Sequence, residues 1–451
     1  MGVPTIGDAR DGRAKQGGSD VTGSTEQWSN WGRSARAFPT RIERPQSTEE
    51  LRLAVVRAAE RGERVRPVGA GFSTNAIAAA PEVLVDTRGL RGLRAIDRDA
   101  GTATFGAGTT VAEASALLEA EGLALVNPSS DPAVTLAGAM ATGSHGTSLH
   151  APSVSSQLLE ATLVTADGGA VRVSDRRNAE LWPALRLSLG ALGVFAEVVV
   201  PVVPTFRVRS DESRERLRPV LDSFVERARA SHHFAVRWRP HTGEAFVRRL
   251  NREVGDVGDE PEPGRGVRGI AAVRDGLVIG LAKAVPALVP AINAVGNLLH
   301  PTGEMLAGPV SGLAARPTLP VVTMEYSFPL DDLVGVVREL DERLRGVLAP
   351  SIVRLSVAPA DDNWLSTAYG REVGRIMISV PSGVDPRSTF TPAEELFLAN
   401  GGLPHWGMVH TVRAAEFAHV VSRFSDFHHA RERLDPDLRF TNGYLQRVLG
   451  H

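Results

Sequence analysis

Apolar residues in the first half of the chain follow a helical period in two places. Between residues 51 and 58 they recur every three or four positions, which predicts an amphipathic helix. Residues 47–50 have the composition of a capping box, in which two side chains satisfy backbone N–H groups at a helix start. Gly62 predicts the end of that helix. A second capping box at residues 110–113 predicts a helix that reaches about residue 122.

Short apolar runs bounded by turn residues predict the strands. They cover residues 83–86, 102–106, 158–166, 171–173 and 196–203 in the first half of the chain, and residues 321–328, 352–357 and 375–380 in the second half. Helices near residues 330–346 and 391–400 are expected to cover the second group of strands. This irregular order predicts an α+β fold. It lacks the strand–Gly-x-Gly-x-x-Gly–helix unit of a nicotinamide-binding domain.

Length and charge narrow the class of protein. The chain has 451 residues, enough for two domains with a sizeable core. Its net charge of −2 gives no indication of a general affinity for nucleic acid or for an anionic membrane. The absence of cysteine excludes disulfide bonds and thiolate chemistry, and it fits a cytoplasmic protein. Residues 1–24 are polar, so we expect a disordered tail rather than a signal peptide.

Two glycine-rich segments beside predicted strands are the candidate ligand-binding loops. The first loop covers residues 67–73 and the second loop covers residues 131–146. Glycine lets backbone N–H groups approach a ligand where a Cβ atom would clash. Successive exposed N–H groups form an anion site that needs no lysine. A single Gly-x-Gly motif is most often a turn, whereas two such loops together predict a pyrophosphate site.

Both loops resemble the FAD-binding loops of the vanillyl-alcohol-oxidase-type flavoproteins. Within that superfamily the chain resembles the aldonolactone oxidase and alditol oxidase group, from about Trp28 to the C-terminus. The Leu-Gly-x-Leu-Gly segment at residues 189–193 and the closing segments at residues 404–408 and 434–445 belong to this resemblance. The residues that it implies for FAD binding are Pro67, Val68, Gly69, Ala70, Gly71, Phe72, Ser73, Ser130, Thr135, Gly138, Thr142, Gly143, His145, Gly146, Gly193 and Val194.

The resemblance also implies an architecture and a chemistry. It implies a two-domain PCMH-type flavoprotein, with an FAD-binding domain at residues 25–205, a substrate domain of sheet and helices at residues 206–410, and a C-terminal segment at residues 411–451 that returns to the FAD domain. In such enzymes a carbinol C–H of a small-molecule substrate gives a hydride to flavin N5. Oxygen or another acceptor then takes the electrons, and the protein supplies position and electrostatics.

The region after residue 205 changes in composition, as expected for a second domain. Residues 254–268 are rich in glycine, proline and acidic residues and predict an exposed or disordered loop. Residues 269–312 are unusually apolar, but Lys283 and prolines interrupt the run, which makes it too broken for a membrane span. We expect helices that pack over the substrate side. Contact with a membrane surface or a partner is the alternative.

The group's active-site strand carries a Glu-x-Arg pair before an Asp-Asp-x-x-Leu-Ser segment, which residues 361–366 match. Counted without gaps, Arg354 stands at the glutamate position and Ser356 at the arginine position. With a two-residue insertion near Pro359, Arg354 stands at the arginine position and Ile352 at the glutamate position. Neither register supplies an acid, so Arg354 and Ser356 are both catalytic candidates.

The family's His-Trp-x-Lys segment corresponds to residues 405–408, with Met408 in place of the lysine. Reduced flavin carries negative charge near N1, so the loss of this cation changes how that charge is stabilised. The missing polyol-handling groups predict a more apolar pocket and a specialised, non-polyol substrate. His405, Met408 and His410 complete the catalytic candidates, because a histidine can act as acid or base near neutral pH.

Glu325 lies in a Met-Glu-Tyr segment that resembles a family strand, and a structural role is expected for it. The histidines show no metal-ligand spacing, so we expect no metal.

Three functions remain open at this stage. The first is an FAD-dependent oxidoreductase that acts on an alcohol-type C–H. The second is a cyclase or isomerase that uses FAD without net oxidation. The third is a flavin-binding protein without turnover.

The FAD is expected to be bound without a covalent link. Relatives often carry a histidine joined to the flavin at the end of the first loop, where this chain has Phe72, and a cysteinyl link is excluded because the chain has no cysteine. After acid precipitation and a denaturing gel, all flavin should appear in the supernatant. A fluorescent protein band would contradict the prediction and would make His145 the first residue to examine.

Overall fold

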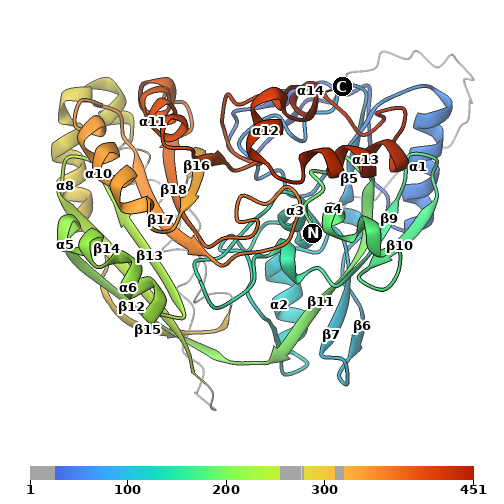
Figure 1. The fold of residues 1–451 in the computed structure, drawn as a ribbon, viewed down its shortest axis with the longest axis horizontal. Coiled ribbons are helices and arrows are strands. Elements are labelled where there is room, and N and C mark those ends of the chain that lie inside the picture. Colours follow the sequence, from blue (N-terminus) through green and yellow to red (C-terminus); the bar gives the residue numbers. More distant parts are fainter. Residues whose placement is uncertain (1–25, 254–275, 277–278, 310–318, 451) are drawn as a thin grey trace, which may run out of the picture.

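The computed structural model describes residues 26–253, 276, 279–309 and 319–450. The chain forms two neighbouring parts, each built around its own antiparallel sheet (Figure 1). The predicted tail at residues 1–24 and the predicted loop at residues 254–268 lie outside the described residues. Among the described residues, no helix combines the length and the apolar character that crossing a membrane requires.

The first part contains a short ribbon, a parallel sheet and an antiparallel sheet. The ribbon pairs β1 (Trp28–Ser29) with β2 (Arg36–Ala37), and the parallel sheet has the order β3 (Arg41–Glu43), β5 (Val83–Asp86), β4 (Val65–Val68). The antiparallel sheet has the order β10 (Ala170–Ser174), β9 (Glu160–Val164), β11 (Val194–Pro204), β7 (Thr102–Gly106), β6 (Leu93–Asp97), with β8 (Leu123–Leu125) paired to β11.

The second part is built on an eight-stranded sheet. Its order is β15 (Gly303–Ala307), β12 (Arg207–Arg216), β14 (Glu244–Glu253), β13 (His233–Trp238), β17 (Ile352–Ala358), β18 (Val373–Pro381), β16 (Val321–Pro329), β19 (Leu403–Pro404). Since β11 belongs to the first part and β12 to the second, we keep a domain boundary near residue 205 as our proposal.

The helices cover the outer faces of these sheets and the top of the first part (Figure 1). They are α1 (Thr48–Glu60), α2 (Val111–Glu119), α3 (Leu136–Ala141), α4 (Trp182–Leu185), α5 (Leu217–Asp222), α6 (Phe224–Ala230), α8 (Val289–Leu298), α10 (Leu333–Leu344), α11 (Arg387–Ala399), α12 (Ala414–Val420), α13 (Phe424–Leu434) and α14 (Gly443–Leu449). Short 3-10 turns occur at η1 (Thr87–Gly89), η2 (Ser155–Gln157), η3 (Ala179–Leu181) and η4 (Pro286–Leu288).

Elements with strong local signals form where the sequence predicts them. Helix α1 follows the N-cap Ser47, whose Oγ accepts a hydrogen bond from the Glu50 N–H at 3.1 Å. Strands β9 and β10 form the predicted hairpin, and β16, β17 and β18 end within two residues of the predicted bounds. No strands were predicted between residues 205 and 250, where β12, β13 and β14 lie. Arginine and glutamate occupy the inner face of these strands, so the apolar alternation expected of a strand is weak.

The described part of the apolar segment packs through polar contacts. Asn293 and Asn297 of α8 are buried; Asn293 Nδ2 donates to the Pro240 carbonyl at 2.9 Å, and Arg239 Nη1 donates to Asn297 Oδ1 at 2.8 Å. Leu298, in contrast, is 70% exposed. The helix therefore lies against the second part with Val289 buried and Leu298 exposed.

The C-terminal helices α12, α13 and α14 lie over the first part (Figure 1). Phe417 of α12, Phe427 of α13 and Leu445 of α14 belong to the same buried core as Phe105 of β7 and Val198 of β11. The chain therefore leaves the eight-stranded sheet after β19. Its last helices then pack into the core of the first part.

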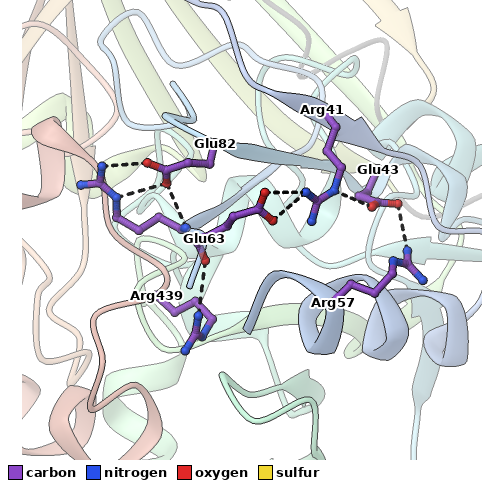
Figure 2. A network of polar contacts seen from close by, with 7 residues as sticks. Arg41, Glu43, Arg57, Glu63, Glu82 and Arg439 are labelled. Carbon is purple, nitrogen blue, oxygen red and sulfur yellow. Dashed lines mark hydrogen bonds and ion pairs between the residues drawn. The ribbon is translucent and has the colours of Figure 1, made fainter. Parts of the chain in front are cut away.

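A group of ion pairs adds a second link between the C-terminal segment and the first part (Figure 2). Arg41 pairs with Glu43 at 3.0 Å and with Glu63 at 2.6 Å, and Arg57 of α1 reaches Glu43 at 3.1 Å. Arg439 Nη1 donates to the Glu63 carbonyl at 3.4 Å. These contacts join β3, α1 and the C-terminal segment at the edge of the parallel sheet.

Arg66 on β4 is a buried arginine at this junction. Its guanidinium donates to four backbone carbonyls, those of Ile77 at 3.1 Å, Leu189 at 2.9 Å, Gly190 at 2.9 Å and Phe440 at 2.8 Å. Burial lowers the pKa of Arg66 to about 9, so it is still charged at neutral pH. One side chain thus ties four separate segments together.

Replacing this side chain should destabilise the protein. In Arg66→Met four buried carbonyls lose their donor, and at about 1 kcal/mol for each we expect the free energy of unfolding to fall by about 4 kcal/mol. Arg64→Met is the matched control, because Arg64 is part-exposed and pairs with Glu82 at 2.9 Å, a kind of contact that contributes about 1 kcal/mol or less. Urea denaturation followed by tryptophan fluorescence measures both. Equal unfolding midpoints in the two variants would refute the role assigned to Arg66.

Candidate active site

One cavity of about 560 Å³ lies between the glycine loops and the inner face of the eight-stranded sheet. It is within the volume range of ordinary small-molecule sites. Of the residues that the resemblance assigned to FAD, all except Gly143 line it. Gly143, with φ 78°, lines a small neighbouring pocket together with Trp406. Segments distant in sequence therefore converge on one site.

The two glycine loops touch at a position that has no room for a side chain. A Cβ atom on Gly69 of the first loop would lie 2.1 Å from Thr135 Oγ1 of the second loop. Thr135 Oγ1 also accepts a hydrogen bond from the Gly138 N–H at 3.3 Å, at the start of α3. Gly71 has φ 70°, in the left-handed region that favours glycine. The loops thus present backbone to the cavity at close range, as a bound dinucleotide requires.

Aromatic rings complete the part of the cavity beside the first loop. Phe72 stacks on Trp31 with ring centroids 5.1 Å apart and an angle of 19° between the rings, and both residues line the cavity. Gly193, with φ 146°, brings the segment before β11 against β9, where a Cβ atom would lie 2.6 Å from the Val164 carbonyl. Backbone-lined loops, flat apolar walls and sufficient volume together fit FAD.

Strand register places four lining side chains in one row across the eight-stranded sheet. Glu325 on β16 lies opposite Met377 on β18, which lies opposite Arg354 on β17. Arg354 in turn lies opposite Arg237 on β13. Directly opposed residues project from the same face of a sheet, and all four line the cavity. The row therefore includes one acid, Glu325 on β16, two strands away from Arg354 on β17.

Glu325 joins the sheet to the second glycine loop through an ion pair. Its Oε1 lies 2.7 Å from His145 Nε2, and His145 Nδ1 lies 2.9 Å from the Gly146 carbonyl. Burial acts to raise the pKa of Glu325, but the charge and hydrogen bond of His145 outweigh burial and hold it at about 2. The carboxylate is therefore ionised at neutral pH. The pair holds the second glycine loop against the sheet.

His405 makes contacts to backbone on two sides. Its Nδ1 accepts a hydrogen bond from the Gly407 N–H at 3.0 Å, and the ring also hydrogen-bonds to the backbone of Gly143. Burial lowers the pKa of His405 to about 4, so the ring is neutral at pH 7. It lines the cavity and positions the second loop.

Two histidines and a carboxylate come together in the fold although they are far apart in the sequence. One ligand atom from each of His145, Glu325 and His405 lies within 4.8 Å of the others. The direct contact between His145 and Glu325 and the backbone partners of His405 describe a hydrogen-bonded cluster, so the absence of a metal stays a prediction.

The remaining catalytic candidates separate into two groups. Ser356 and Met408 line the cavity. His410 does not: its Nε2 lies 2.9 Å from Tyr444 Oη, and its ring packs edge-on against Phe417. Burial lowers the pKa of His410 to about 3. The structure therefore corrects the catalytic expectation for His410, because this histidine lies in the core beneath the C-terminal helices.

Sequence reasoning missed the charged residues that β12, β13 and β14 contribute. Glu212, Arg237 and Arg248 of these strands line the cavity, as does His300 between α8 and β15, so the expected apolar pocket is wrong for this wall. The available signal was the two-residue spacing of Phe246 and Arg248, which is the period of one strand face.

Comparison with known proteins identifies both regions of the chain. Residues 39–174 match an FAD binding domain, and residues 198–448 match the D-arabinono-1,4-lactone oxidase family. A cholesterol oxidase structure from B. sterolicum shares the fold, with a TM-score of 0.80 at 16% identity over 94% of this chain and 96% of that chain. The predicted α+β, PCMH-type architecture is confirmed.

Two curated relatives match nearly the whole chain. L-gulono-1,4-lactone dehydrogenase of Mycobacterium tuberculosis (strain ATCC 25618 / H37Rv) is 31% identical over 430 residues, which cover 94% of this chain and 99% of that protein. Alditol oxidase of Streptomyces sp. (strain IKD472 / FERM P-14339) is 29% identical over 441 residues, which cover 93% and 98%. The chain therefore belongs to the D-arabinono-1,4-lactone oxidase family of FAD-dependent oxidoreductases.

Proposed function

We propose that this protein oxidises the carbinol carbon of a specialised small molecule that is not a neutral polyol. One observation carries the proposal. The two glycine loops line the same cavity as the row of Glu325, Met377 and Arg354 on the sheet. Bound FAD supplies a two-electron acceptor there. The substrate loses its carbinol hydrogen as a hydride and its hydroxyl hydrogen as a proton, so a C=O bond forms, and the electrons pass to oxygen or another acceptor.

The first and second glycine loops and residues 193–194 would hold the FAD. Phe72 is stacked on Trp31 and has no ring nitrogen to form a link. Both ring nitrogens of His145 already face oxygen atoms, those of Glu325 and Gly146. These contacts support non-covalent attachment.

Arg354 would bind the oxygen of the reacting carbon. A guanidinium is always a donor, so it stabilises the negative charge that develops on this oxygen as the proton leaves. Met377, which lies opposite Arg354 in the sheet, also lines the cavity, and so does Met408, which stands where the family has a lysine. Neither methionine offers a strong hydrogen bond to a hydroxyl group. A neutral polyol would therefore find no hydrogen-bonding partner at these two positions.

His145 would hold the Glu325 carboxylate at the edge of the cavity. It lies in the cavity lining and is held in an ion pair with the buried Glu325 carboxylate. The pair fixes the orientation of the ring, as the partner of an active-site histidine commonly does.

Adding one methyl group at the contact between the glycine loops should weaken FAD retention. Gly69→Ala would force its Cβ against Thr135 Oγ1, where the present separation is 2.1 Å, and the loops must move apart. We expect about 10-fold or greater loss of FAD affinity, the effect of about 1.4 kcal/mol. FAD content after gel filtration measures this.

Gly335→Ala is the matched control, because a Cβ atom at this position in α10 meets nothing within 4 Å. Normal FAD retention in Gly69→Ala would show that the loop contact does not shape the cofactor site.

Removing the guanidinium of Arg354 should slow substrate oxidation. In Arg354→Ala the developing charge on oxygen loses a preorganised donor, and we expect the rate of flavin bleaching under anaerobic conditions to fall about 10²-fold or more. Arg345→Ala, at an exposed ion pair with Asp341, is the control and should behave as the unmodified protein.

Three outcomes would contradict the proposal. An unchanged bleaching rate in Arg354→Ala removes this residue from the reaction. Absence of bleaching while product forms indicates a cyclase or isomerase. Fast turnover of sorbitol, xylitol or an aldonolactone at low concentration shows that the substrate is a neutral polyol or lactone.

A further inference from the structure

A second, much smaller cavity lies where the second glycine loop meets the eight-stranded sheet. Its space for the centre of a water-sized ligand is about 10 Å³. Thr142 and His405 line both this cavity and the main one, whereas Gly143 lines the small cavity alone. The small cavity therefore lies directly beside the loop that would hold FAD.

Arg375 on β18 places a buried guanidinium at this small cavity. The residue is 3% exposed, and its Nε donates to Ser327 Oγ at 3.3 Å. Its Nη1, in contrast, is buried and has no hydrogen-bond partner among the residues that the structure describes. A guanidinium stays charged in a protein, and a buried N–H group without a partner costs free energy. This N–H group therefore needs an acceptor that the described residues do not supply.

Asp361 brings a carboxylate to the same cavity from the loop after β17. Its Oδ2 accepts a hydrogen bond from Ser366 Oγ at 2.7 Å, and its Oδ1 accepts one from the Asn363 N–H at 3.2 Å. Burial lowers the pKa of Arg375, and the charges of Glu325 and Asp361 act in the opposite direction. In the part of the chain that the structure describes, no direct hydrogen bond joins Arg375 to either carboxylate.

The size and the polar lining of the cavity select its occupant. A polar cavity of this size holds about one water molecule, and a buried water commonly makes about three hydrogen bonds to groups that otherwise lack partners. The hydroxyls of Ser366 and Thr367 belong to the same lining. A halide ion also accepts hydrogen bonds from a guanidinium, but it is larger than water and would lie beside the like charge of Asp361.

We propose that Arg375 binds one ordered water molecule in this cavity, and that this water joins the guanidinium to the Asp361 carboxylate. The water accepts a hydrogen bond from Arg375 Nη1 and donates one to Asp361, so the two opposite charges are linked without direct contact. The link holds β18 and the loop after β17 beside Gly143 and His405. Arg375 does not line the main cavity, so it is a positioning residue for the second glycine loop.

The first test is a crystal structure of the unmodified, FAD-loaded chain in which ordered waters are resolved. We expect one density peak at about 2.7–3.2 Å from Arg375 Nη1 and at a similar distance from an Asp361 oxygen. A second crystal, soaked in sodium bromide, reveals an anion by its anomalous scattering, and we expect no bromide in this cavity. Absence of the water peak, a bromide peak, or direct contact between Arg375 and Asp361 would each overturn the proposal.

The second test measures how the water site affects the cofactor loop. Arg375→Met removes the donor, and we expect FAD to bind about 10-fold more weakly, the order of effect of one buried hydrogen bond to a charged group. Arg375→Lys keeps a charged donor and should restore part of the affinity. Arg371→Met is the matched control, because Arg371 is exposed and lies just before the same strand. Unchanged FAD affinity in Arg375→Met would overturn the positioning role.

A double-mutant cycle separates the water link from a general loss of stability. If one water joins the two side chains, the combined effect of Arg375→Met and Asp361→Asn on FAD affinity is smaller than the sum of their separate effects. Additive effects would show that the two side chains share no link. Melting temperatures show that each variant is folded, and the crystal structure of the unmodified chain decides the proposal if Arg375→Met does not fold. None of these measurements uses a substrate, so their failure leaves the proposed oxidation unaffected.

Discussion

The buried guanidinium of Arg66 is the contact on which the cofactor side of this protein depends. It donates to the carbonyls of Leu189 and Gly190, just before residues 193–194 of the cavity wall, and to Phe440 near the C-terminus. Leu189 has φ 56°, a left-handed conformation that costs a residue with a Cβ atom about 1 kcal/mol. The hydrogen bond from Arg66 helps to keep that turn in place. A charged side chain tolerates full burial here because carbonyl oxygens surround it.

The second constraint is the register of the eight-stranded sheet. Backbone pairing between β16, β18, β17 and β13 decides which side chains share a face, since a shift of one residue would turn each of them to the other side. The observed register sends Glu325 toward the second glycine loop and Arg354 toward the cavity. Side chains from separate strands and from the second glycine loop therefore line one cavity.

The cofactor side and the sheet side of the site differ in the physical interactions that they offer to a ligand. The cofactor side presents backbone, with glycines where the loops approach closely, and depends on shape. The sheet side presents charge in a place with little water, where electrostatic interactions are stronger than in solvent. Family membership accounts for the first half. The second half departs from the family's Glu-x-Arg and lysine pattern, and this departure motivates a substrate different from a neutral polyol.

The sequence by itself determined the fold class, the cofactor and the residues of the glycine loops. These depend on local chemistry: a capping box, a turn or a glycine-rich loop carries its signal within a few residues. It did not determine that His410 lies against Tyr444 in the core, or that Glu325 lies in one row with Met377 and Arg354. Nor did it predict that Arg237 and Arg248 face the same cavity as Arg354. Those facts depend on which strands pair and in which register, and the pairing is set by hydrogen bonds and packing between segments up to about a hundred residues apart. Only the tertiary structure decided them, because such contacts form across the chain and leave no local pattern in the sequence.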